Sequence, residues 1–161
     1  MLDRLSTIIG RSASWLTPLM VVVTFVVVVM RYVFDAGYIW IQESVIWMHA
    51  VVFMLGAAYA LHDEEHVRVD VFYRNMSPQR RAWVDLIGVV VFLLPLCAFL
   101  AWNSWDFVVQ SWRIGESSRE PGGLPYPLLP LLKSALLLMP LTVSLQGLSL
   151  LLKSVRELKG R

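Results

Sequence analysis

The chain has 161 residues, of which 57% are hydrophobic and only 16% are charged, and its mean hydropathy is +0.62. Soluble domains are about 45–50% apolar and about 25% charged, so this chain has too few charged residues to cover a water-exposed surface. The formal net charge of +2, without a basic patch interleaved with aromatic residues, excludes a nucleic-acid-binding protein. We therefore expect residues 1–161 to form one compact membrane unit, with the lipid bilayer as its solvent.

The first two predicted membrane spans cover residues 13–34 and 40–61, each close to the roughly 20 apolar residues that a bilayer core requires. The first run exceeds the apolar region of about 7–15 residues in a signal peptide, so we interpret it as an anchor that is not cleaved. Arg31 ends the first span, and Glu43 lies one turn inside the second. A carboxylate at that depth is costly unless paired, which predicts an Arg31–Glu43 pair across the hairpin. An ion or substrate site at Glu43 is the alternative.

The end of the second span is rich in small residues, which let a neighbouring helix backbone approach closely. We predict a helix-packing face at this run, which consists of Gly56, Ala57, Ala58 and Ala60.

His62 and His66 follow with the i, i+4 spacing of zinc metalloprotease motifs. Those motifs need a glutamate directly after the first histidine, and Asp63 occupies that position here. The third ligand of an open catalytic zinc site is also missing from the sequence nearby. We therefore predict no catalytic residue, metal or cofactor, and keep a small membrane metalloenzyme that uses His62 and His66 as an alternative.

The third predicted span, residues 78–113, is unusually long. Ser77 and Pro78 are typical of a helix start, with Ser as the cap and Pro at the first helical position. At 1.5 Å per residue this helix reaches roughly 50 Å, well beyond a hydrocarbon core of about 30 Å. Its end is expected to project above the membrane.

Residues 115–130 contain three glycines and four prolines, a composition that excludes regular structure. The last predicted span covers residues 131–152 and should kink at Pro140. Ten of the 14 Lys and Arg residues lie on the side of the two termini and of the segment after the second span. The positive-inside rule therefore predicts cytoplasmic N and C termini and an outward-facing 115–130 loop.

A channel or a self-sufficient transporter would show inverted repeats and broken helices with polar groups near the midplane. The sequence contains no internal repeat, and its spans are nearly devoid of charge at mid-depth. We interpret the chain as a subunit that acts with a partner. An unrelated assembly factor with four spans is a further alternative.

Six segments, in order, resemble the small membrane subunits of TRAP transporters, the tripartite ATP-independent periplasmic uptake systems of bacteria and archaea. Two features depart from that family: Ser44 stands where many relatives carry a second acid, and Pro127 and Pro130 lie close to the last helix. The matching segments are Arg31-Tyr32-Val33-Phe34, Trp40 with Glu43, Gly56 to Leu61 with His66 to Asp70, Gly115-Glu116-Ser117-Ser118, Gly122-Gly123-Leu124-Pro125, and Leu145-Gln146-Gly147, with Lys133 and Pro140 also in place.

The resemblance implies an all-α, four-helix subunit of the bacterial or archaeal cytoplasmic (inner) membrane, without catalysis. It implies sodium-coupled import of organic acids or related solutes, with two protein partners. One is a large membrane subunit that works as an elevator, and the other is a periplasmic substrate-binding protein. The residues implied in large-subunit packing are Gly56, Ala57, Ala58, Ala60, Arg68, Asp70, Gln146 and Gly147, and those implied in periplasmic docking are Arg113, Glu116, Ser117, Arg119, Leu124 and Pro125.

Overall fold

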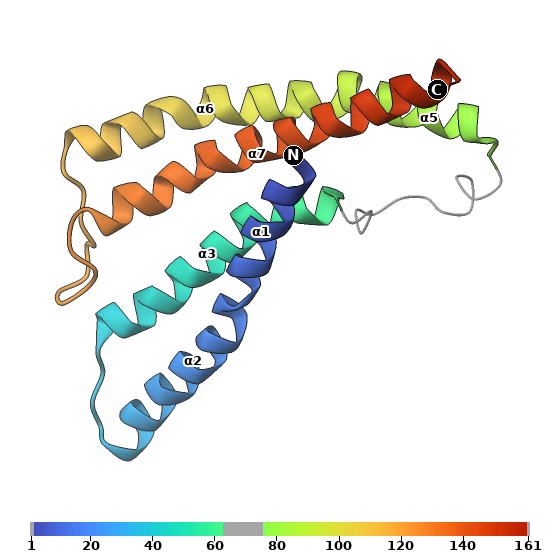
Figure 1. The fold of residues 1–161 in the computed structure, drawn as a ribbon. Helices are drawn as coiled ribbons and strands as arrows, with labels where there is room; N and C mark the ends of the chain where they lie inside the picture. The colour runs from blue at the N-terminus through green and yellow to red at the C-terminus, as the bar shows by residue number, and fades with distance from the viewer. Residues whose placement is uncertain (1, 63–75, 161) are drawn as a thin grey trace.

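The computed structural model describes the backbone of residues 2–62 and 76–160, and the side chains of residues 7–61 and 76–160. These residues form helices and connecting loops without any strand, so the predicted all-α class is confirmed. The elements are α1 (Leu2–Ser14), α2 (Leu16–Val33), α3 (Ile39–His62), α5 (Pro78–Ile87), the π-helical segment η1 (Gly88–Leu93), α6 (Leu94–Arg113) and α7 (Leu128–Leu158) (Figure 1).

Four helical stretches of the described residues are long and apolar enough to cross a membrane: Thr7–Val33, Ile39–Leu61, Pro78–Arg113 and Leu128–Leu158. Their number agrees with the sequence-based prediction. The last stretch starts earlier than predicted, inside the proline-rich run, because the first turn of a helix does not need its own backbone N–H donors.

The third span is continuous from α5 through η1 to α6, although Pro95 lies inside it. Leu94 donates its N–H to the carbonyl of Val89, five residues back, which is the π-helical hydrogen bond. A proline has no N–H and clashes with the carbonyl four residues before it, so a locally widened turn accommodates Pro95 without ending the helix. With 36 residues the span is about 54 Å long, as the sequence predicted.

The helices form two groups that meet at one interface. Helices α1, α2 and α3 pack on one another, as do α5, η1, α6 and α7, and the main contact between the groups is that of α3 with α7 (Figure 1). Helix α2 contacts α1 and α3 and has no buried residue. Many large apolar side chains are exposed on both groups, for example Phe25, Phe53 and Phe92, as expected where lipid is the solvent.

Candidate functional site

The loop between α6 and α7, residues 114–127, is hydrogen-bonded to Glu43 on α3. One carboxylate oxygen of Glu43 accepts a hydrogen bond from the Ser118 hydroxyl, and the other accepts one from the backbone N–H of Leu124 at 2.7 Å. Glu43 is half-buried, so these donors replace part of the water that the carboxylate loses. Hydrogen bonds to an ionised group are about twice as strong as neutral ones. Glu43 therefore fixes the position of the loop on α3.

The α6–α7 loop also closes on itself around this contact. The N–H of Ser118 donates to the carbonyl of Leu124 at 3.1 Å, and the N–H of Gly123 donates to the carbonyl of Glu120 at 3.0 Å. A Cβ atom at Gly123 would lie 2.8 Å from Glu43 Oε2 and would also strike the Ser118 side chain. Only glycine fits at position 123 while the loop remains bound to Glu43.

Trp47 extends the same contact along α3. Its indole N–H donates to the carbonyl of Leu128 at 3.2 Å, at the start of α7. Residues four apart lie on one face of a helix, so Glu43 and Trp47 face the same way. One face of α3 therefore binds both the loop and the beginning of α7.

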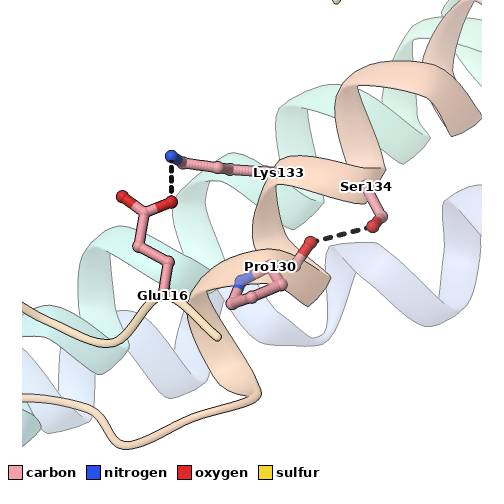
Figure 2. Close-up of polar contacts among 4 residues, drawn as sticks. All are labelled: Glu116, Pro130, Lys133 and Ser134. Carbon is pink, nitrogen blue, oxygen red and sulfur yellow. Dashed lines mark hydrogen bonds and ion pairs between the residues drawn. The ribbon is translucent and has the colours of Figure 1, made fainter. Parts of the chain in front are cut away.

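A second contact joins the loop to α7 directly. Lys133 Nζ lies 2.5 Å from Glu116 Oε2 in an ion pair whose side chains are only 17% and 16% exposed (Figure 2). The same ammonium group lies 3.9 Å from the centroid of the Phe107 ring, a cation–π geometry. One turn of α7 is thus tied to both α6 and the loop.

Hydrogen bonds from neighbouring residues support this turn. The Trp112 indole N–H donates to the Ser134 hydroxyl at 2.9 Å, and that hydroxyl donates to the Pro130 carbonyl at 2.8 Å (Figure 2). Trp112 also contacts Tyr126 edge-to-face, with ring centroids 6.3 Å apart. The end of α6, the loop and the start of α7 therefore hold one another in place.

The ion pair changes the acidity of Glu116. The hydrogen bond from Lys133 lowers the pKa of the Glu116 carboxyl below its ordinary value of 4.5. The nearby Ser111 hydroxyl and the charge of Arg119 lower this pKa further, against an opposing effect of burial. Glu116 is therefore ionised at neutral pH, and its charge is paired with that of Lys133 inside the chain.

The pairing of Glu43 with Arg31, predicted from the sequence, is not among the contacts that the structure gives for the described residues. Glu43 binds Ser118 and Leu124 instead, and Arg31 lines a cavity together with Gln42. Successive residues of a helix point about 100° apart, so Gln42 faces α2 while Glu43 faces the loop. The Glu43 carboxylate does have hydrogen-bond partners, as expected from the cost of burying a charge, but they belong to the loop between α6 and α7.

The six residues assigned to docking separate into two groups. Glu116 and Leu124 are half-buried, and each contributes to internal contacts through its carboxylate or its backbone. The other four are exposed on or beside the loop and are available to a partner: Arg113, Ser117, Arg119 and Pro125.

The residues assigned to large-subunit packing separate similarly. Ala58 and Gln146 are only 2% and 3% exposed. A Cβ atom at Gly147 would lie 2.6 Å from Leu93 Cδ2, so this glycine allows α7 to pack closely on η1. These three residues are covered within the chain itself.

Gly56 meets nothing within 4 Å of an added Cβ, and Ala57 and Ala60 are half-buried, so this part of α3 is still accessible. Arg68, Asp70 and His66, with the side chain of His62, lie outside the described residues.

Sequence reasoning did not identify Ser118, Gly123 and Trp47 as contact residues. The available signal was the cost of a carboxylate and of Lys133 at the ends of spans, since a charge there requires a partner. That signal shows that partners exist, but it does not indicate which loop supplies them.

The family model for the DctQ component of tripartite ATP-independent periplasmic transporters matches residues 20–157. A C4-dicarboxylate TRAP transporter small permease protein, DctQ of Vibrio cholerae serotype O1, is 30% identical over 88 residues, which are 55% of this chain and 38% of that relative. The matched part is therefore less than half of the relative's length. No solved structure matches the chain.

Proposed function

The chain belongs to the DctQ family of TRAP transporter components, and on this premise we propose how it works within its complex. It is a multi-pass protein of the inner membrane and a small permease subunit of a transporter. We propose that it scaffolds a large elevator-type membrane subunit and presents the α6–α7 loop to a periplasmic substrate-binding protein.

The scaffold role is supported by the surface of the helices. Helix α2 has no buried residue, and Gly56 on α3 is open to a neighbouring backbone. Helices in a membrane associate through close packing at small residues and not through a hydrophobic driving force. A large helical partner would therefore find accessible surface on the α1–α3 group while α6 and α7 keep their own contacts.

The docking role is supported above all by the hydrogen bonds from Ser118 and Leu124 to Glu43. A loop that is already fixed loses little conformational entropy when a partner binds, which favours affinity. Arg113 and Arg119 remain exposed on or beside this fixed loop, where they can attract an acidic surface. The positive-inside rule favours the periplasmic side for this loop, because ten of the 14 Lys and Arg residues lie on the side of the two termini.

The transported solute is proposed from the relative alone. The Vibrio cholerae protein is named for C4-dicarboxylate transport, and we propose organic acids or related solutes as substrates. Import with sodium is a separate proposal, which rests on the resemblance to TRAP transporters. The substrate and sodium sites would belong to the large subunit.

Co-purification tests the scaffold role. The chain is co-expressed with the products of its neighbouring genes, purified in mild detergent, and its partners are identified by mass spectrometry. A stable complex with a much larger polytopic protein is expected. Replacing Gly56 by leucine should weaken that complex, whereas the same change at the loop residue Gly37, which is also open, should not. A chain that purifies alone, or with an unrelated partner, would contradict the proposal and favour an assembly factor.

A further inference from the structure

A groove between α2 and α3 is lined by one stripe of residues from each helix. Thr24, Val28 and Arg31 lie on α2 at helical spacing, and Gln42 and Ile46 face them from α3. The groove contains a cavity of about 340 Å³, and a smaller cavity of about 90 Å³ adjoins it at the hairpin end. Both cavities share Arg31 in their lining.

The groove is apolar along most of its length and polar at one end. Arg31 lies in the last turn of α2, close to the hairpin that joins α2 to α3. No described acidic side chain forms an ion pair with its guanidinium, and the nearby Gln42 is exposed. An arginine at the end of a membrane span places its charge at the level of the lipid headgroups. The lining of the groove therefore consists of apolar side chains within the membrane and of a cationic side chain at its surface.

We propose that this groove binds one phospholipid, with its phosphate on Arg31 and an acyl chain between α2 and α3. The planar guanidinium binds a phosphate through two parallel hydrogen bonds, and Gln42 can donate a further one. Arg31 lines the larger cavity together with Val28 and the smaller one together with Gly37, so a phosphate on its side chain would lie next to the end of the apolar stripe. The inference depends on membrane insertion and not on the docking role.

The lining of the groove favours a lipid over a protein helix. Its side chains are mostly apolar, among them Val28 and Ile46, and the stripe ends at the cation Arg31. This order matches an acyl chain joined to an anionic phosphate, which a guanidinium binds well.

Native mass spectrometry of the chain in complex with its large subunit tests the proposal. The complex is purified from membranes, delipidated by detergent washing, and the phospholipid that remains bound is measured. We expect about tenfold weaker retention or more after Arg31→Gln, the effect of losing a charge-assisted hydrogen bond. Arg31→Lys, which keeps the charge but not the paired geometry, should lie between the wild type and Arg31→Gln.

Two further variants separate the groove from general surface charge. Val45→Trp fills the cavity without altering charge and should also release the lipid, while Arg119→Gln on the exposed loop should retain it. Thermal unfolding in detergent gives an independent readout, with added phosphatidylglycerol expected to stabilise the wild type but not Arg31→Gln.

Three results would overturn the proposal. The first is unchanged lipid retention in both Arg31→Gln and Val45→Trp. The second is equal stabilisation by inorganic phosphate alone, which would indicate a site for a free anion. The third is a cysteine at Ile46 that cross-links to the large subunit and not to a photoreactive phospholipid, which would mean that a protein occupies the groove.

Discussion

Glu43 on α3 accepts a hydrogen bond at 2.7 Å from the backbone N–H of Leu124, which lies 81 residues further along the chain. The Ser118 hydroxyl binds the other oxygen of the same carboxylate. The contact therefore connects the first half of the chain to the loop that precedes the last span.

Glu43→Gln should loosen the α6–α7 loop. The amide keeps one acceptor oxygen, but its NH₂ group faces the donors that the carboxylate satisfied, and the negative charge is lost. Losing hydrogen bonds to an ionised group should lower the free energy of unfolding by about 1 to 3 kcal/mol. Hydrogen exchange of the Leu124 amide should speed up, whereas Glu120→Gln, at an exposed acid of the same loop, should change neither quantity. Equal exchange in both variants would contradict the role given to Glu43.

Gly123→Ala should displace the loop from α3 although it adds a single methyl group. The new Cβ would lie 2.8 Å from Glu43 Oε2, closer than non-bonded atoms approach. Gly37→Ala is the matched control, because an added Cβ at Gly37 meets nothing within 4 Å. Thermal unfolding in detergent should show a lower midpoint for Gly123→Ala only. An unchanged midpoint, together with a protected Leu124 amide, would show that the loop tolerates the methyl group.

The Glu116–Lys133 pair should respond to charge exchange. Glu116→Lys or Lys133→Glu alone leaves two like charges at the α6–α7 end, so either should lower stability and raise the susceptibility of the loop to proteolysis. The double exchange should partly restore both, because opposite charges face each other again. A double variant no better than the worse single variant would exclude direct pairing as the important interaction.

The same pair predicts a dependence on pH. Because Lys133 lowers the pKa of Glu116 below 4.5, the stabilisation is fully present above the ordinary pKa of a glutamate. It is lost as the pH falls from that value through the lowered pKa of the folded protein. Proteolysis of the loop should therefore be insensitive to pH between neutrality and pH 5 and should increase in more acidic solution. Glu116→Gln should abolish this increase. If proteolysis of that variant still increases in acid, the increase comes from the titration of another group.

The sequence predicts the helices well because apolar run length and chain breakers determine them. The unusual length of residues 78–113 follows from the helical pattern after Ser77-Pro78, which continues on both sides of Pro95. The π-helical turn at Gly88–Leu93 could not be located in advance, since Pro95 allows either a kink or a widened turn.

The candidate site was predictable only in part. Because a buried carboxylate is costly unless paired, the sequence indicated correctly that Glu43 has a partner. Arg31 was the predicted partner because it is close to Glu43 in the sequence. In the structure α3 is rotated so that Glu43 faces the loop. The glycines and prolines of residues 115–127 indicated irregular structure without indicating its hydrogen bonds. Likewise, a small residue such as Gly147 is compatible with a helix contact to the large subunit or with one inside this chain. The close approach of Leu93 to Gly147 shows that the contact lies within the chain.

The docking surface that we propose for a periplasmic binding protein is the loop held by Glu43. The most direct test is the binding rate of that soluble protein to the two-subunit complex in nanodiscs, with Arg119→Glu compared with Arg156→Glu near the C-terminus. Both arginines are exposed, and the proposed orientation places them on opposite sides of the membrane. Slower association with a weaker salt dependence for Arg119→Glu alone is the predicted result. Equal association of both variants and the wild type would contradict the claim.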